Sequence, residues 1–346
     1  MKSSVGIIPV FVSHMGCPNH CTFCNQRKIN GVVDAIEPEA LFSYVEIYLK
    51  TMKRDQVELA FFGGSFTGIE LKRQIAYLEN AFKLKEQGFI HKIRLSTRPD
   101  YIDEDVIERL NRFSVDLVEL GCQSFDETVL LSSQRGHEKE SIYKAVALLK
   151  KANISFGIQL MLGLQNDSFE KFKQSVAQTI SLNPTCVRLY PALVIRETQL
   201  EQDYYSGVFV PISLEKAIIW CAFALKLFYK SNIDVIRIGL QKTDLIDFDA
   251  SVVAGPFHPA FGEMVLSYLF YDAIDLKLYQ LNLFEDSVTI HVNPKQISAA
   301  IGNNKSNIKR LKEKYCEIKI VADTFVESYH FILEAGIHSV EDTIIK

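Results

Sequence analysis

Three cysteines near the amino terminus have side chains that could bind a metal. They are spaced C-x3-C-x2-C within the stretch Gly16–Asn25. Deprotonated thiolates bind metals, and as soft ligands they select zinc, copper(I) or iron–sulfur clusters. A structural zinc ion needs four ligands, whereas an iron–sulfur cluster held by only three thiolates leaves one iron open to a further molecule. The candidate ligands are Cys17, Cys21 and Cys24.

A zinc site is the main alternative, because His14 or His20 could supply the fourth ligand. A disulfide with one spare thiol is disfavoured, since the first residues lack the apolar stretch and cleavage site of a secretory signal. The remaining cysteines lie among apolar neighbours, and we expect them to be small buried residues. These are Cys122, Cys186, Cys221 and Cys316.

The cysteine stretch, with Phe23 directly before its last cysteine, resembles the radical S-adenosylmethionine (SAM) enzymes. The resemblance implies that Cys17, Cys21 and Cys24 bind a 4Fe–4S cluster, and that SAM binds the fourth iron through its amino and carboxylate groups. It also implies that Phe23 lies against the adenine, with its carbonyl oxygen near the exocyclic amine.

Composition indicates an ordinary globular protein. The chain has 346 residues, of which 48% are hydrophobic and 23% charged, and its formal net charge is −4. This length suits one large domain with an appendage, and we expect domains at 1–280 and 285–346. There is no run of 18 apolar residues, so we expect a cytoplasmic protein without a membrane span.

Strand-like and helix-like stretches alternate along most of the chain. This alternation predicts an α/β fold with a parallel sheet, either a barrel or a doubly wound sheet. Polar and glycine-rich stretches follow the strands, where barrel enzymes place their chemistry. The resemblance implies a partial, six-unit β/α barrel that is open on one side. We expect strands at Val5–Val12, Val57–Phe62, Lys92–Ser96, Asp116–Cys122, Ile154–Leu162, Thr185–Tyr190 and Asp234–Leu240, with helices between them.

A glycine pair, Gly63 and Gly64, follows the second expected strand. Glycines allow positive φ and let a ligand approach the backbone closely, although such a pair also occurs in ordinary turns. At this place in the radical SAM enzymes a glycine pair binds the methionine amino group, so the resemblance implies that role here.

Four further stretches resemble the catalytic subunit of Elongator and its bacterial and archaeal relatives, and more weakly the oxygen-independent coproporphyrinogen oxidases. They are Ser96–Tyr101, Glu119–Ser124, Arg135–His137 and Leu189–Arg196, and the likeness runs from about Pro9 to about Leu200.

The Elongator resemblance implies a set of residues that contact SAM. Glutamine suits a ribose hydroxyl, and arginine can grip a carboxylate with two parallel hydrogen bonds. Glu119 would face a ribose or the polar edge of the cofactor. The other implied residues are Ser96, Arg98, Gln123 and Arg135.

Several other polar residues allow two interpretations. Gln159 and Arg188 lie on expected strands and would meet substrate if they point into the barrel. His258 and Glu263 precede or begin an expected helix, where they would act near the substrate or simply cap the helix.

The last part of the chain, Asp286–Asp323, resembles a minimal KH nucleic-acid module, with the order strand, helix, link, helix, strand. A G-x-x-G link in such modules clamps the sugar–phosphate backbone. Here the link begins with Gly302, but Lys305 stands at the second glycine position. From Glu285 to Ile320 there are 7 Lys or Arg and 4 acidic residues, and this basic face could equally be only solvated.

Together these features predict a radical SAM enzyme that acts on RNA, with a tRNA base as the modified group. An electron donor of the flavodoxin or ferredoxin type would be a partner. Two alternatives stay open: a radical enzyme that acts on a tetrapyrrole or another small molecule, and an RNA-binding protein whose metal site is only structural.

Overall fold

The structure is a computed structural model that describes residues 5–12, 17, 21–25, 35–52, 54–240, 246–248 and 250–345. The chain packs as two compact units. The first comprises Met1–Ile212 and Leu240–Phe257, and the second comprises Ser213–Gly239 and His258–Lys346. This division into compact units does not test the predicted domains 1–280 and 285–346, which stay a prediction.

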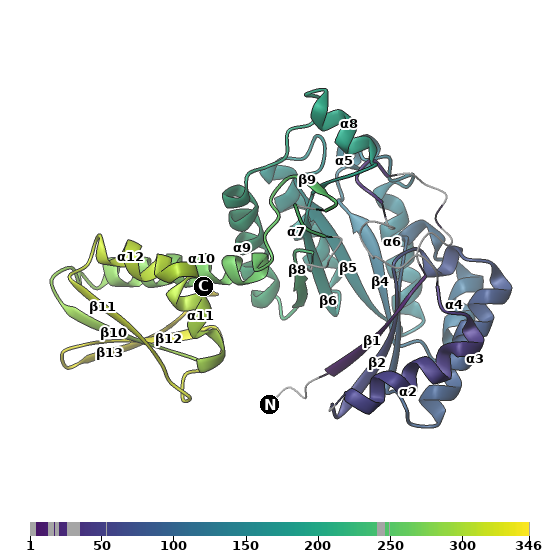
Figure 1. The fold of residues 1–346 in the computed structure, drawn as a ribbon, viewed down its shortest axis with the longest axis horizontal. Coiled ribbons are helices and arrows are strands. Elements are labelled where there is room, and N and C mark those ends of the chain that lie inside the picture. The colour runs from purple at the N-terminus through teal and green to yellow at the C-terminus, as the bar shows by residue number, and fades with distance from the viewer. Residues whose placement is uncertain are drawn as a thin grey trace. The chain divides into compact units, whose positions relative to one another are not determined.

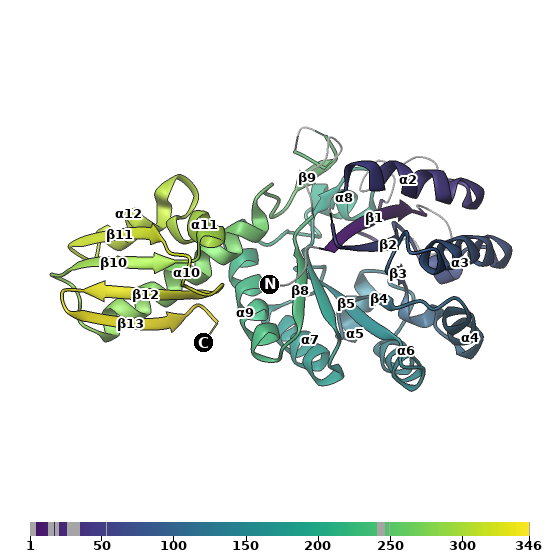
Figure 2. The same cartoon turned by 90° about the horizontal axis from the view of Figure 1, so that it is seen from below.

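A parallel sheet organises the fold, which confirms the predicted partial barrel. Strands β1 to β6 lie in chain order, each pairs in parallel with the next, and β8 completes a sheet of seven. Seen from below, the strands form an arc (Figure 2). The strands are β1 (Val5–Phe11), β2 (Gln56–Phe62), β3 (Lys92–Thr97), β4 (Leu117–Gln123), β5 (Ser155–Leu162), β6 (Cys186–Pro191) and β8 (Asp234–Ile238).

Five helices of the first unit cover the outer face of this arc (Figure 2). Two of them start at a side-chain cap: Asp103 accepts a hydrogen bond from the amide of Val106 at 2.8 Å at the start of α4, and Ser168 caps α7. Parallel strands need such crossovers, so the cap positions help to define the barrel. The helices are α2 (Leu41–Thr51), α3 (Leu71–Glu86), α4 (Glu104–Arg112), α6 (Lys139–Lys151) and α7 (Phe169–Leu182).

Short elements close over the cysteine stretch. Cys21 and Phe23 belong to one buried apolar cluster with Val129, Leu200 and Phe209. This cluster packs the stretch against segments that follow β4 and β6. The elements involved are α5 (Glu127–Ser132), α8 (Gln199–Tyr205) and the antiparallel pair β7 (Val194–Ile195) and β9 (Val252–Ala254).

The second unit contains a separate sheet with the order β11-β10-β12-β13. β10 and β11 are parallel, while β12 and β13 form an antiparallel hairpin that the sequence pattern did not predict. Helices α10 and α12 lie on one face of this sheet (Figure 1). The elements are α9 (Leu214–Lys230), α10 (Phe261–Gln280), β10 (Ser287–Val292), α11 (Ile297–Ile301), α12 (Ser306–Lys312), β11 (Glu317–Ala322), β12 (His330–Ala335) and β13 (His338–Thr343).

The link between α11 and α12 has a glycine-like backbone. Gly302 has φ +79°, and a side chain there would lie 2.5 Å from the Ser306 hydroxyl. Asn304 and Lys305 also have positive φ, of +50° and +61°. Lys305 therefore adopts the conformation that a second glycine would favour, at a cost of about 1 kcal/mol. The KH-like character of this segment stays a prediction.

One expectation for the scattered cysteines was wrong. Cys122, Cys186 and Cys221 are buried as expected, but Cys316 is exposed. It directly precedes β11, where its amide bonds to the carbonyl of Phe284 and its apolar neighbours in sequence do not cover it.

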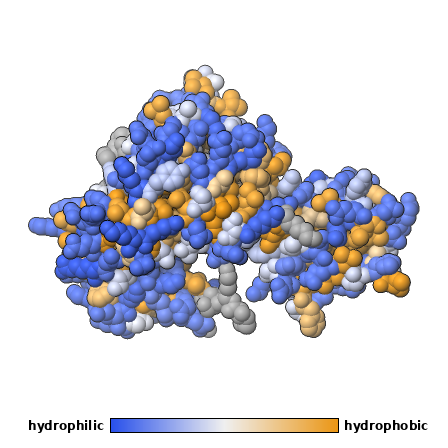
Figure 3. Space-filling model, turned by 180° about the vertical axis from the view of Figure 1, so that it is seen from behind, coloured by the Kyte–Doolittle hydropathy of each residue, from blue (hydrophilic) through white to orange (hydrophobic). Residues whose placement is uncertain are grey.

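Exposed apolar residues occur at turns of the second unit, and apolar surface appears as orange areas in Figure 3. Phe325 and Ile337 are 93% and 96% exposed. In the part of the chain that the structure describes, no helix has both the length and the apolar character needed to cross a bilayer.

We expect the substitution Gly157→Ala to destabilise the barrel by about 1–3 kcal/mol. A Cβ at this position of β5 would lie 2.7 Å from the sulfur of Cys186 and 3.2 Å from its carbonyl oxygen. The free energy of unfolding in urea measures the effect. In a Cys186→Ala background the same change should cost less, because the sulfur contact is gone. Equal costs in both backgrounds would contradict this account.

Candidate active site

The predicted site residues gather at the carboxyl edge of the sheet. The cysteine stretch follows β1, the glycine pair follows β2, and Arg98 follows β3. Gln123 ends β4, and Arg135 lies in the loop between α5 and α6. Because parallel strands end at the same edge, segments far apart in sequence meet here.

Backbone hydrogen bonds hold the described part of the cysteine stretch. The amide of Val12, just before it, bonds to the carbonyl of Phe62 at the end of β2, at 2.8 Å. Thr22 donates through its amide to the carbonyl of Ser133 at 3.1 Å and accepts from the amide of Leu200 at 2.8 Å. The stretch is therefore attached to β2, to the α5 segment and to α8. His14 and His20, the alternative zinc ligands, lie outside the described residues.

The thiols of Cys17 and Cys21 are close enough to Cys24 to affect its pKa. Burial, followed by the negative charge of Cys21 and more weakly of Cys17, raises the pKa of Cys24 to about 12, while Arg135 opposes the increase. Cys21 is only 5% exposed. Among the residues with described positions, no three His, Cys, Asp or Glu side chains stand in a geometry that would hold a metal ion.

Arg135 joins the cysteine stretch to β4. Its Nη1 donates to the sulfur of Cys21 at 3.2 Å, and its Nη2 donates to the carbonyl of Gly121 at 2.5 Å. The residue is 6% exposed. Its Nε is buried and has no hydrogen-bond partner within the described part of the chain.

Arg98 is a second buried cation near the thiols. Its guanidinium binds both carboxylate oxygens of Asp100, at 3.0 and 2.9 Å, and lies over the ring of Tyr101. Burial opposes its charge, but Asp100, Cys17 and Cys21 outweigh that effect and raise the pKa of Arg98. The guanidinium fork of Arg98 is thus occupied by Asp100 in this structure, and a contact of Arg98 with SAM stays a prediction.

The remaining predicted SAM contacts lie beside these two arginines. Gln123 is 4% exposed and has φ +69°, at a bulge where β4 slips against β5. It accepts a hydrogen bond from Gln159 on β5 at 3.1 Å. Ser96 is half-buried, as are Gly63, with φ +85°, and Gly64. Their contacts with SAM stay predictions.

Glu119 belongs to a charge network inside the barrel. Arg94 on β3 donates twice to its Oε1, at 3.1 and 2.8 Å, and Arg188 on β6 binds both of its oxygens. Arg94 also binds Glu58 on β2, at 2.7 Å. Two acids and two arginines balance in charge, and removing one member of such a group typically costs 3–5 kcal/mol.

This network includes Glu58 and Arg94, which the sequence reasoning missed. A signal was available, since each is a lone charge between apolar residues on an expected buried strand. It also fixes Arg188, whose guanidinium lies 5.0 Å from the ring centroid of Phe62 across the barrel. A contact between Glu119 and the cofactor stays a prediction, with both carboxylate oxygens already bonded to arginines.

His258 and Glu263 also had two interpretations. Nδ1 of His258 accepts a hydrogen bond from the amide of Ala260 at 3.1 Å, just before α10 begins, and α10 has no side-chain cap. A part of either residue near the substrate stays a prediction.

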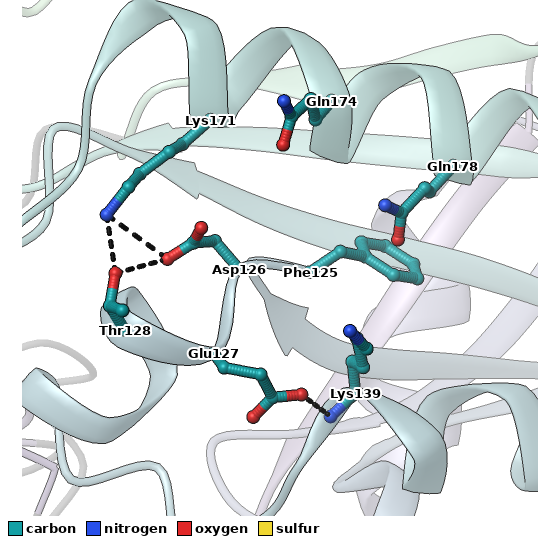
Figure 4. Close-up of a pocket in the computed structure, with 8 residues that line it drawn as sticks. All are labelled: Phe125, Asp126, Glu127, Thr128, Lys139, Lys171, Gln174 and Gln178. Carbon is teal, nitrogen blue, oxygen red and sulfur yellow. Dashed lines mark hydrogen bonds and ion pairs between the residues drawn. The ribbon is translucent and has the colours of Figure 1, made fainter.

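A separate cavity of about 220 Å³ lies on the helical side of the barrel, between the β4–α5 loop and α7 (Figure 4). Lys171 binds Asp126 at 3.3 Å and the hydroxyl of Thr128, and Glu127 accepts from the amide of Lys139 at 3.0 Å. These groups satisfy one another, and none of the predicted site residues lines the cavity.

Two family models match most of the chain. Residues 12–177 match the radical SAM superfamily, and residues 184–270 match the radical SAM C-terminal domain. The chain belongs to the radical SAM superfamily. As an enzyme of this superfamily, it has a 4Fe–4S cluster and SAM as its cofactors. Both matches end before the β10–β13 sheet begins.

Curated relatives point to the Elongator group. The chain is 28% identical over 310 residues to a tRNA uridine(34) acetyltransferase of Methanocaldococcus infernus, covering 77% of this chain and 57% of the relative. It is 26% identical over 178 residues to Elongator complex protein 3 of Schizosaccharomyces pombe, covering 44% and 32%. The chain spans about half the length of the acetyltransferase relatives that it matches.

A solved structure agrees with this assignment. The archaeal Methanocaldococcus infernus Elp3 with an amino-terminal deletion superposes with a TM-score of 0.62 at 26% identity. The match covers 78% of this chain and 63% of that chain.

The residues present fit the cluster of the radical SAM superfamily. Three thiols influence one another electrostatically, and an arginine already donates to one of their sulfurs. Among the described residues, five buried side-chain polar atoms lack a partner, and four belong to the cysteine stretch or to the segment from 133 to 137. Unpartnered buried donors next to a sulfur-rich site suit a bound group with acceptor atoms. The four atoms are Thr22 Oγ1, Ser133 Oγ, Arg135 Nε and His137 Nε2.

We expect His137 to make the protein less stable in acid. Burial, with help from Arg135, lowers the pKa of this histidine to about 4. Between about pH 6.5 and 4 the unfolded state therefore takes up a proton that the folded state does not. The free energy of unfolding should fall by roughly 2 kcal/mol over this range.

Urea unfolding at a series of pH values measures this contribution as a difference between wild type and His137→Gln. The fall should be smaller in the variant, whereas His338→Gln, at an exposed position, should leave it unchanged. Parallel curves for wild type and His137→Gln would show that His137 takes up its proton equally in both states.

Proposed function

We propose that this protein is a radical SAM enzyme whose cluster is bound by Cys17, Cys21 and Cys24, and which modifies RNA at a tRNA base. The observation that carries the proposal is the contact of Arg135 with the sulfur of Cys21, in electrostatic range of Cys24, at the carboxyl edge of a radical SAM barrel.

Cys17, Cys21 and Cys24 would hold the cluster, which together with SAM would supply one-electron radical chemistry for removing a hydrogen atom from the substrate. The protein binds and orients these groups and excludes water. In this proposal Phe23 packs beside the adenine, the glycine pair offers its backbone to the methionine amino group, and Gln123 meets a ribose hydroxyl. Ser96 and Arg98 complete the pocket wall. A flavodoxin- or ferredoxin-type protein supplies the electron.

RNA is the proposed substrate because the acetyltransferase relatives are named for a tRNA uridine. The same relatives are named as acetyltransferases, but this chain spans only about half of their length. The proposal therefore includes radical formation and RNA recognition and leaves acetyl transfer out. Exposed lysines on and after the α11–α12 link support recognition of a phosphate backbone. They are Lys305, Lys309 and Lys312.

We expect each of Cys17→Ala, Cys21→Ala and Cys24→Ala to abolish retention of a 4Fe–4S cluster after anaerobic reconstitution with iron and sulfide. Iron and sulfide content and the visible absorbance of the cluster measure the effect. Cys316→Ala, at an exposed thiol of the second unit, should retain the cluster. A wild-type protein that takes up one zinc ion per chain and no cluster would overturn the proposal.

We expect Lys305→Gly to weaken tRNA binding several-fold while it stabilises the protein by about 1 kcal/mol. The substitution removes a cation, and glycine relieves the left-handed backbone at this position. Filter binding over a series of salt concentrations measures how the logarithm of the binding constant falls with the logarithm of the salt concentration. The slope of this plot should be smaller by about the amount that one phosphate contact contributes.

The control for this test is Lys319→Ala, which removes the same charge from the exposed side of β11. It should change the salt slope less than Lys305→Gly does. If wild type binds no tRNA near physiological salt, the RNA substrate is wrong. If the two variants change the slope equally, the link has no special part in RNA binding.

A further inference from the structure

We infer that the guanidinium of Arg310, which lies on the ring of Tyr271, is a platform on which one unpaired RNA base stacks. The inference rests on the proposed function, because it takes RNA as the partner of this chain. It adds a contact with a base to the phosphate contacts of the exposed lysines. It also places that contact between α10 and α12, and not on the link from α11 to α12.

The helix α12 is fixed along α10 on both sides of this stack. Asn307, near the start of α12, donates to the carbonyl of Ser267 at 2.9 Å, one turn before Tyr271 on α10. Just past the end of α12, the hydroxyl of Tyr315 donates to the carboxylate of Asp275 at 3.0 Å, one turn after Tyr271. The segment of α12 between these two contacts is therefore restrained from both ends.

The stack is a close contact between a buried ring and an accessible cation. Cζ of Arg310 lies 3.6 Å from the centroid of the Tyr271 ring. Tyr271 is 8% exposed, whereas Arg310 is exposed. Tyr268 lies near the same charge, since burial and Asp272 raise its pKa and Arg310 opposes the increase. A planar, delocalised cation held against an aromatic ring is a surface on which a further ring can stack.

The charge of Arg310 is not paired with a carboxylate among the described residues. The acidic residues of α10 on this side bind other cations. Asp275 binds Lys314 at 2.7 Å, and Asp272 binds Lys226 at 3.1 Å. Arg310 thus differs from its neighbours in having only the ring as a contact, which leaves its donors and its charge to a ligand.

Lysines extend the positive surface along α12. From Lys305 to Lys314 the chain has five Lys or Arg residues and one acidic residue, although its formal net charge is −4. Lys309 and Lys312 are exposed on the turns that flank Arg310. A single-stranded nucleic acid uses both features of this surface, because its phosphates meet the cations and a base meets the planar group.

The planar platform favours an unpaired RNA base over two other ligands. An acidic protein surface would match the lysines but would have no use for a flat stacking group. In duplex RNA the bases already stack on one another inside the helix, so their faces are not available to a side chain. The predicted ligand is therefore a single-stranded stretch or loop of RNA.

The test is the binding of a short fluorescent oligoadenylate to the full chain, measured by fluorescence anisotropy. The same strand with abasic residues in place of its bases has equal phosphates and nothing to stack. Wild type should bind the base-bearing strand about ten-fold more tightly than the abasic strand. Arg310→Lys keeps the charge and loses the planar group, so it should bind the base-bearing strand about ten-fold more weakly than wild type does. Its affinity for the abasic strand and its salt slope should not change.

Arg112→Lys is the matched control. Arg112 is also an exposed arginine next to an aromatic ring, with Cζ 5.2 Å from the centroid of Phe113 at the end of α4. This substitution should leave the affinities for both strands unchanged. An equal loss in Arg112→Lys and Arg310→Lys would show that the position on α12 has no special part, which would overturn the inference.

The two strands and tRNA separate the remaining outcomes. If wild type binds the base-bearing and abasic strands equally, phosphate contacts account for binding and the inference fails. If Arg310→Lys binds the base-bearing strand as tightly as wild type does, the base stacks elsewhere and the inference also fails. If wild type binds tRNA but neither strand, only the inference fails. If wild type binds no RNA of any kind, the RNA substrate of the proposed function is wrong as well, and an acidic protein is the partner that fits these cations.

Discussion

The attachment of the cysteine stretch to the rest of the barrel is the constraint on which the site depends. A short irregular segment that carries three thiols has no regular structure of its own to fix it. Val12 donates a hydrogen bond, Thr22 donates one and accepts one, and Cys21 accepts one, and together these bonds tie it to three other parts of the chain, the end of β2, the segment at the end of α5 and the start of α8. Each of these partners sits at the carboxyl edge of the sheet, so the parallel strands fix the site.

Beneath this edge the barrel interior is unusually charged. Glu58, Arg94, Glu119 and Arg188 connect β2, β3, β4 and β6 through ion pairs among largely buried side chains. Such a network contributes less to net stability than apolar packing would, because burying the charges offsets their attraction. Its physical effect is to fix the positions of these four side chains in the interior of the barrel, next to the candidate site. Gly157 on β5 leaves room for this arrangement next to Cys186.

The second unit has a different kind of sheet and one strongly restrained link. Its sheet mixes one parallel pair with an antiparallel hairpin, and its most restrained feature is the link from Gly302 to Lys305. Asn307, directly after the link, is 3% exposed and donates to the carbonyls of Ser267, Ala299 and Ala300. Asn307 therefore anchors the end of the link to α10 and α11, while Lys305 is exposed in a backbone conformation that costs free energy. A strained, exposed cation is the kind of feature that binding, more than stability, explains.

Alternating apolar strands and helices in the sequence predicted a parallel sheet, and the resemblance to the radical SAM enzymes predicted the partial barrel, the cluster and SAM. The C-x3-C-x2-C spacing by itself left zinc as an alternative, and the three cysteines as cluster ligands stay a prediction. The contacts that act on those ligands were decided by the tertiary structure. Arg135 reaches the sulfur of Cys21 across 114 positions, and Glu119 is enclosed by arginines from two other strands. The hairpin of β12 and β13 also escaped prediction, because β13 alternates too few apolar residues to be recognised. Local patterns record which residues share a strand or a cap, whereas pairing between distant side chains depends on how the strands are placed side by side.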